Sequence, residues 1–109
     1  MTLTDATGIS SVRVTVTLAQ GQETAGQAAD LVGAADGASS AAVVHSSGVA
    51  WEEREGPVSQ ADGTTRYVDI FVTERDSLLY IVECSTLAAT YATTNQLIFQ
   101  PLLRSFAFG

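Results

Sequence analysis

The sequence contains one histidine, His45, and one cysteine, Cys84. A single histidine excludes a two-histidine metal site, and a single cysteine excludes an internal disulfide and a zinc site built from cysteines. His45 precedes two serines, which is compatible with a Ser-His-Asp arrangement, but no G-x-S-x-G motif marks a nucleophile. Cys84 follows Glu83, whose charge disfavours the reactive thiolate. We interpret His45 as a hydrogen-bonded residue of a strand or turn and Cys84 as a thiol of the core.

Three glutamates surround Arg54 in the segment WEERE. Paired carboxylates can serve as general acid and base, or bind calcium. If the segment is a strand, alternation places Glu53 and Glu55 on one face and Glu52 on the other. No glycine-punctuated Asp/Asn loop accompanies these residues, so we interpret them as a solvated strand edge whose charge discourages edge-to-edge pairing.

Glycine-rich phosphate motifs are absent, because GAADG at residues 33–37 lacks the Lys-Ser/Thr pair of a P-loop and does not lead from a strand into a helix. We therefore predict no catalytic residue, no metal site and no cofactor, and a protein that is not an enzyme.

Three aromatic residues are the candidates for a binding surface: Trp51, Tyr67 and Phe71. Tyr67 and Phe71 share one face of a predicted strand, so the three could form a recognition patch or line a pocket between a sheet and a helix. Burial beneath a helix is the favoured alternative for all three.

The 109 residues carry a net charge of −7, with five arginines and no lysine. This length provides for one domain, which we place at residues 1–109. Few cations argue against binding of nucleic acid or of an anionic membrane. The sequence shows no signal-peptide pattern and no apolar run long enough to span a membrane. We therefore expect a soluble, cytoplasmic protein, or an exported one if the chain is a trimmed part of a longer precursor.

Alternating apolar and polar residues predict a strand over residues 11–19. The residues on its buried face are Val12, Val14, Val16 and Leu18. Two hairpins are predicted further along, at residues 40–55 and 64–85. The strands of the second hairpin are apolar on both faces, which is typical of central strands covered on both sides.

A helix is predicted from Thr24, which has capping-box spacing to Gln27, and it can end at Gly37. Antiparallel hairpins with flanking helices indicate an α+β fold, in which an antiparallel β-sheet carries a helix on each face.

A second helix is predicted to begin near residue 85 or 86. Its apolar stripe comprises Leu87, Tyr91, Ile98, Leu102 and Phe106. Pro101 leaves the carbonyl of Leu97 without a helical donor, so we expect a kink. The kink would turn Leu102 and Phe106, with Phe108 beside them, onto the sheet as a closing latch. The sheet residues expected beneath this latch are Val68, Ile70 and Leu79.

Residues 77–109 resemble the close of domains in the PsbP-like superfamily. There, a strand leads through a short polar stretch to a helix with Tyr and then Phe, and the domain ends in Ser-Phe-x-Phe. The matching positions here are residues 80–82, Tyr91, Phe99, Ser105, Phe106 and Phe108. The resemblance implies an α/β/α sandwich about an antiparallel sheet, no shared catalytic residues, and a role in binding.

The sequence departs from the family at its start, where an aromatic-rich opening hairpin is absent and the chain leads directly into the strand at residues 11–19. A sheet without that hairpin would have an uncovered edge or face, so we expect a homodimer. We hypothesise a non-enzymatic binding or assembly module that acts through protein contacts. The alternative is a carrier of small apolar ligands, with a pocket near Trp51, Tyr67 and Phe71.

Overall fold

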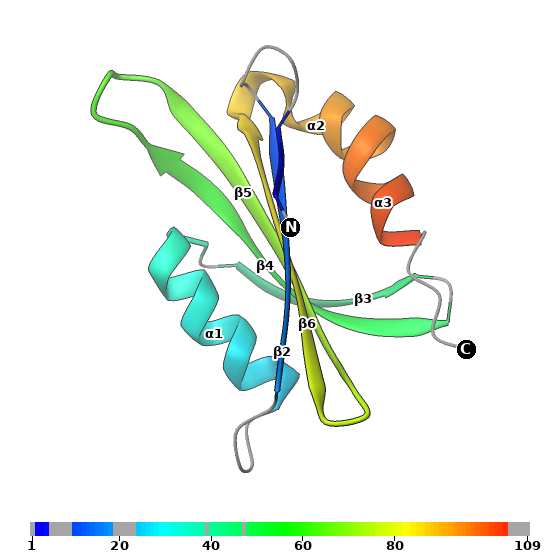
Figure 1. Ribbon diagram of the computed structural model, residues 1–109. Coiled ribbons are helices and arrows are strands. Elements are labelled where there is room, and N and C mark those ends of the chain that lie inside the picture. Colours follow the sequence, from blue (N-terminus) through cyan, green and yellow to red (C-terminus); the bar gives the residue numbers. More distant parts are fainter. Residues whose placement is uncertain (1, 5–9, 19–23, 39, 47, 105–109) are drawn as a thin grey trace.

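The computed structural model describes residues 2–4, 10–18, 24–38, 40–46 and 48–104, with side chains from residue 10 onward. In this part of the chain, six strands form one sheet in which all neighbours are antiparallel (Figure 1). In spatial order the strands are β1 (Thr2–Thr4), β2 (Ser11–Leu18), β6 (Leu78–Leu87), β5 (Thr65–Arg75), β4 (Val49–Ser59) and β3 (Ser40–Ser46).

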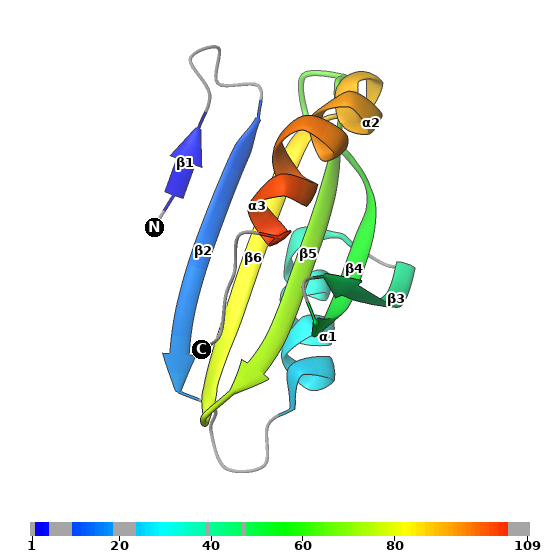
Figure 2. The ribbon, with the colours of Figure 1, turned by 90° about the vertical axis from the view of Figure 1, so that its right-hand side faces the viewer.

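Helices cover both faces of the sheet (Figure 2). Helix α1 (Ala25–Asp36) packs against β4 and β5 on one face. The helical segments that follow β6 lie on the opposite face. The predicted α+β sandwich is therefore confirmed, with its apolar residues divided between two clusters, one beneath α1 and one beneath the carboxyl-terminal helix.

The predicted ends of α1 are confirmed by its capping contacts. The Thr24 hydroxyl accepts a hydrogen bond from the Gln27 amide at 3.2 Å, and the Gln27 side chain accepts one from the Thr24 amide at 3.0 Å. Gly37 ends the helix in the left-handed region, with φ of 83°, a conformation that glycine adopts without steric cost.

Both predicted hairpins are present, as β3–β4 and β5–β6. The β5–β6 turn consists of Asp76 and Ser77, whose φ values of 54° and 64° are both left-handed. Two such residues in succession form the type I′ turn, whose twist matches that of a two-stranded ribbon. The turn therefore sets the register in which β5 and β6 pair along their length.

Strand β1 was not predicted. It pairs with residues 11–13 of β2, so the prediction that the chain leads directly into β2 is wrong. The predicted burial of one face of β2 holds for Val12, while Val14 is half-buried. Val16 and Leu18 are 51% and 64% exposed, because the core cluster beneath the carboxyl-terminal helix includes the first two valines but does not reach these residues.

The carboxyl-terminal helix begins later than predicted, since β6 continues to Leu87. Its successive parts are a 3₁₀ turn, η1 (Ala88–Thr90), helix α2 (Tyr91–Thr94), a π-helical segment, η2 (Asn95–Phe99), and helix α3 (Gln100–Arg104). In the π-helical segment the Gln100 amide donates to the Asn95 carbonyl five residues back. This wide turn lies directly before Pro101, where the missing amide and the proline ring disturb the regular helical ladder.

The wide turn shifts the buried side of the helix by one residue. Phe99 and Leu103 are buried, whereas Ile98 is 44% exposed and Leu102 only partly buried. The predicted stripe through Ile98 and Leu102 is therefore wrong in its phase beyond Tyr91, because a five-residue hydrogen-bonded turn inserts one residue into the period.

The helix also packs on the opposite sheet face from the one predicted. Phe99 and Leu103 belong to the cluster of Trp51, Phe71 and Val82. The expected contact residues lie in the other cluster, with α1: Val68, Ile70 and Leu79. Phe106 and Phe108, the predicted latch, lie outside the described residues.

Candidate functional site

The three aromatic candidates lie on the sheet face that α2, η2 and α3 cover. Trp51 and Phe71 are fully buried and pack in one cluster with Phe99 and Leu103. Tyr67 is half-buried, and its ring centroid lies 4.0 Å from that of Tyr91. Burial beneath a helix, the favoured alternative, is thus confirmed for Trp51 and Phe71.

A cavity of about 240 Å³ lies elsewhere, near the end of α1. Its charged lining residues are Arg13, Arg66, Asp36 and Glu83. Arg13 and Glu83 form an ion pair at 3.5 Å, while burial and the nearby Asp36 charge raise the pKa of Glu83. Because charges of both signs already face one another across this cavity, it offers no clear preference for a charged ligand.

His45 lies on a strand and Cys84 lies in the core, as the sequence indicated for both. His45 lies on the edge strand β3 and is exposed. Cys84 is buried in β6, and burial raises the pKa of its thiol far above the ordinary value. The interpretation of Cys84 as a core thiol is confirmed.

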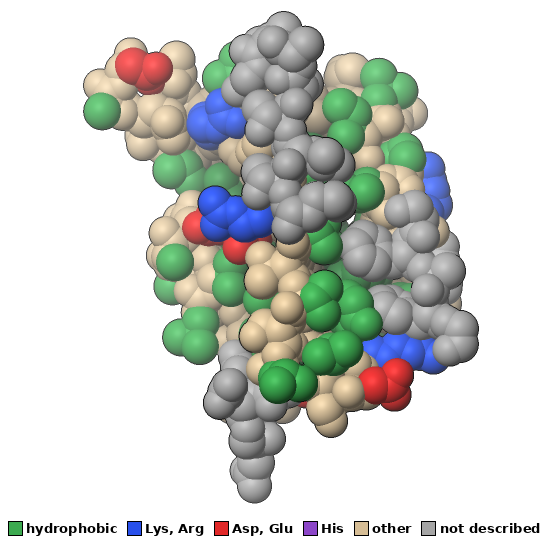
Figure 3. Space-filling model, viewed as in Figure 1, with side chains coloured by type: hydrophobic (Ala, Val, Ile, Leu, Met, Phe, Trp, Pro, Cys, Tyr) green, Lys and Arg blue, Asp and Glu red, His purple; other side chains and the backbone are tan. Residues whose placement is uncertain are grey.

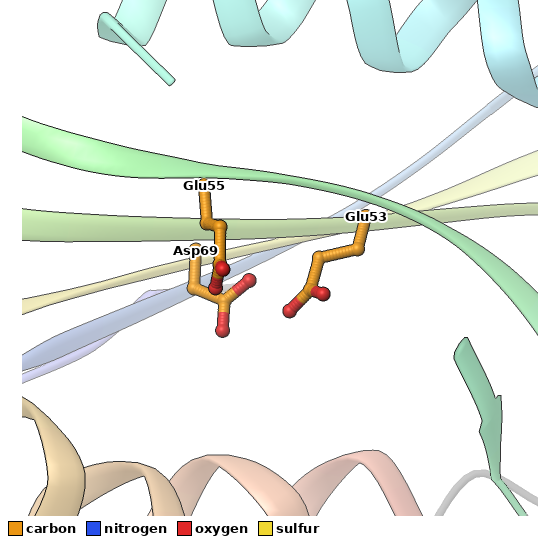
Figure 4. A group of neighbouring side chains, drawn as sticks. All are labelled: Glu53, Glu55 and Asp69. Carbon is orange, nitrogen blue, oxygen red and sulfur yellow. The ribbon is translucent and has the colours of Figure 1, made fainter. Parts of the chain in front are cut away.

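Three carboxylates meet on the face beneath the carboxyl-terminal helix: Glu53 and Glu55 on β4 and Asp69 on β5 (Figure 4). The register places Glu55 directly opposite Asp69, and Glu53 opposite Phe71. One carboxylate oxygen from each residue lies within 4.8 Å of the other two. Period-two alternation points all three side chains to the same side of the sheet.

This arrangement corrects the interpretation of the glutamates as a solvated strand edge. Strand β4 lies between β3 and β5, and both Glu53 and Glu55 are half-buried. Asp69 has no exposed surface at all. The error arose because alternation gives the face of each glutamate but not the strands that flank it.

Burial dominates the electrostatics of Asp69. Removal from water, together with the neighbouring Glu53 and Glu55, raises the pKa of its carboxyl to about 9. The Tyr91 hydroxyl donates a hydrogen bond to Asp69 Oδ2 at 2.5 Å, which opposes it, and lies 3.4 Å from Glu55 Oε2. Asp69 Oδ1 is buried and has no hydrogen-bond partner among the described residues.

The charges on the opposite face of β4 are fully partnered. Arg54 Nε donates to Asp30 Oδ1 at 2.8 Å, and its Nη1 lies 3.3 Å from Glu52 Oε2. The guanidinium also donates to the carbonyl oxygens of Glu53 and Gly26. Arg54 therefore neutralises the α1 side of the strand, whereas no ion pair in the described ranges reaches Glu53, Glu55 or Asp69.

The carboxylate cluster offers oxygen atoms alone, in a partly desolvated position. Such a group must share a proton or hold a cation, because three adjacent negative charges repel one another strongly away from water. Sequence reasoning missed Asp69 and Tyr91. A signal was present, since Asp69 interrupts the apolar run YVDIFV of a strand predicted to be covered on both faces.

Neither the family models nor the curated protein sequences give a significant match to this sequence. The antiparallel sheet, with α1 on one face and the carboxyl-terminal helix on the other, has a PsbP-like fold. The chain is similar in structure to the cyanobacterial PsbP (CyanoP) of Synechocystis sp. PCC 6803, with a TM-score of 0.69 and 19% sequence identity. The match covers 97% of this chain and 72% of that one. The PsbP-like fold that the sequence resemblance implied is therefore confirmed.

None of the helices in the described residues combines the length and the apolar character that crossing a membrane requires.

Proposed function

We propose that this chain is a non-enzymatic binding or assembly module that acts through protein contacts. The observation that carries the proposal is the outer side of β2. Strand β1 pairs with residues 11–13 alone, so residues 15–18 have no strand partner on that side among the described residues. An unpaired strand edge is a template on which another strand can add.

The side chains along this edge favour association. The sequence from Thr15 to Leu18 is Thr-Val-Thr-Leu, which contains no charge and has high β-propensity. Val16 and Leu18 are exposed and stand opposite Tyr80 and Leu78 of β6. Figure 3 shows hydrophobic side chains gathered over the lower parts of β2 and β6. Protective charges of the kind that blunt most strand edges are thus missing here.

A second copy of the chain is the partner that we propose for this edge. Two copies of β2 can pair antiparallel about a two-fold axis, and because residues 15–18 are uncharged, the pairing opposes no like charges. Such pairing would extend the sheet across both chains and bring the exposed Val16 and Leu18 of each copy to the dimer interface.

Light scattering over a range of concentrations tests this proposal, with Leu18→Glu as the variant and Val43→Glu as the matched control. Val43 is 56% exposed on β3, the opposite edge strand. We expect a dimer for the unmodified chain and for Val43→Glu, and a monomer for Leu18→Glu. A monomer for the unmodified chain at high concentration, or a dimer that survives Leu18→Glu, would contradict the role of β2.

The carrier alternative requires open space beside Trp51, Tyr67 and Phe71. Side chains of Phe99 and Leu103 pack against Trp51 and Phe71 instead, so the protein-contact hypothesis is better supported. Saturable quenching of Trp51 fluorescence by small apolar ligands would favour the carrier.

A further inference from the structure

We propose that Glu53, Glu55 and Asp69 form a binding site for a hard divalent cation of the calcium type, located between β4, β5 and the start of the carboxyl-terminal helix. The proposal concerns the interior of one sheet face and is independent of the protein contacts proposed for β2.

The first support is the convergence of the three side chains. They come from two neighbouring strands, and Figure 4 shows that all three carboxylates are directed to the same side of the sheet. One oxygen from each lies within 4.8 Å of the other two. Calcium takes oxygen ligands at about 2.3 to 2.6 Å, so ligands on opposite sides of the ion are separated by about 5 Å. A single ion can therefore reach all three residues.

The second support is the state of Asp69. Its side chain is fully buried, and Oδ2 accepts the hydrogen bond of Tyr91. Its other oxygen, Oδ1, is buried and has no hydrogen-bond partner in the described part of the chain. Buried carboxylate oxygens are nearly always hydrogen-bonded, paired with a charge or bound to a metal. An unpartnered oxygen inside a group of carboxylates points to a missing positive ligand.

The third support is the distribution of cations on β4. Arg54 lies between the two glutamates in sequence, but its guanidinium is held on the opposite face by Asp30 and Glu52. It therefore does not neutralise the carboxylate cluster. A cation from solution would supply the charge that this face of the strand lacks.

The donor types select the kind of cation. The cluster offers carboxylate oxygens, with the Tyr91 hydroxyl 3.4 Å from Glu55 and hydrogen-bonded to Asp69. Such oxygens suit calcium, magnesium and manganese, whereas zinc prefers nitrogen and sulfur. The half-buried position of Glu53 and Glu55 leaves a solvent-facing side for entry and for water ligands.

Terbium luminescence is a direct test, because Tb³⁺ replaces calcium and is excited through a nearby aromatic ring. Tyr91 contacts Asp69, and Tyr67 stacks on Tyr91. We expect a saturable signal with one ion bound per chain, displaced by calcium. Parallel titrations with magnesium and manganese chloride rank the divalent ions at the same site.

Glu55→Gln and Asp69→Asn each remove one carboxylate and keep the side-chain shape. We expect each to weaken Tb³⁺ and calcium binding by about tenfold or more. Glu74→Gln is the matched control, since Glu74 is an exposed acid on β5, and its removal should leave binding unchanged. Far-ultraviolet circular dichroism of each variant establishes that it folds.

An absence of saturable Tb³⁺ binding to the unmodified chain would overturn the proposal. So would an equal loss of affinity in Glu74→Gln, because that result would mean general attraction to an acidic protein. If one cluster variant fails to fold, the other decides the question by the same criterion.

Discussion

The two faces of the sheet hold the charges of β4 in opposite environments. On the α1 face, Arg54 is bonded to Asp30, Glu52 and two backbone carbonyls. On the other face, Glu53 and Glu55 meet the buried Asp69, and the described residues provide a tyrosine hydroxyl but no ion pair. A fully partnered buried charge is a structural element, whereas an unpartnered one points to a ligand or a shared proton. The two faces therefore differ in whether the charges of β4 are neutralised within the fold.

The largest test concerns the packing of the carboxyl-terminal helix over the carboxylate face. Phe99→Ala should lower the free energy of unfolding by about 3 to 5 kcal/mol, because Phe99 is fully buried. Ile98→Ala, one residue earlier and 44% exposed, should cost less than about 1 kcal/mol. Urea unfolding measures both. A larger loss for Ile98→Ala would show that the π-helical segment does not set the phase of this helix.

The next test removes the cation of the α1 face. Arg54→Met should destabilise the protein by about 2 to 3 kcal/mol, because Glu52 and two carbonyl oxygens lose a donor in a partly buried position. Arg13→Met is the control, since its ion pair with Glu83 involves a side chain that is 61% exposed, and the loss should stay below about 1 kcal/mol. Equal effects in thermal unfolding would contradict the structural role of Arg54.

A smaller change in stability is expected from adding a methyl group where α1 packs closely against the sheet. At Gly33 a β-carbon would lie 2.9 Å from the Ala38 carbonyl oxygen and 3.2 Å from Arg54 Cβ. Gly33→Ala should therefore cost about 1 to 3 kcal/mol. At Gly26 the nearest atom is 3.6 Å away, so Gly26→Ala should stabilise α1 by up to about 1 kcal/mol. Chemical denaturation that shows the same sign for both would refute this close approach.

The smallest change in stability is expected from the protonation of Asp69 on the carboxylate face, measured with a chelator present to remove any bound cation. Asp69 has a pKa raised from 3.8 to about 9, so between these values the folded protein holds a proton that the unfolded chain has lost. Stability should therefore fall as pH rises through this window. The titratable groups that face Asp69 are Glu53, Glu55, Tyr67, Tyr91 and Cys84.

Asp69→Asn should flatten this pH dependence and raise stability by about 1 kcal/mol at mildly alkaline pH, a net gain reduced by the weaker bond to Tyr91. Melting temperatures measured across the pH range provide the comparison. A profile as steep in Asp69→Asn as in the unmodified chain would mean that another group titrates.

Local signals in the sequence were sufficient for much of the fold. The capping box at Thr24 and Gln27, with Gly37 at the other end, predicted α1 correctly because its ends are fixed by residues close in sequence. The β5–β6 hairpin was predicted for the same reason. Strand β1 was missed because its three residues are too short a run for alternation to show.

The carboxylate cluster and the phase of the last helix needed information beyond local pattern. Alternation places Glu55 on a face, but only the register of β4 on β5 brings it opposite Asp69. The apolar spacing after Tyr91 assumed a regular helix, whereas the hydrogen bond from Gln100 to Asn95 inserts one residue. The aromatic candidates were chosen for their type, and packing buried Trp51 and Phe71.

The strand order also governs how the chain folds as it is synthesised. Strands β3, β4 and β5 each pair with the next strand in sequence, so the β3–β6 meander can form as soon as its residues leave the ribosome. Strand β2 pairs with β6, which is made much later, as the register of Ser11 with Ser85 shows. The apolar side of β2 therefore lacks its strand partner until β6 has been synthesised. A nascent-chain stall placed before β6 should leave β2 open to chaperones and proteases, and release of β6 should protect it.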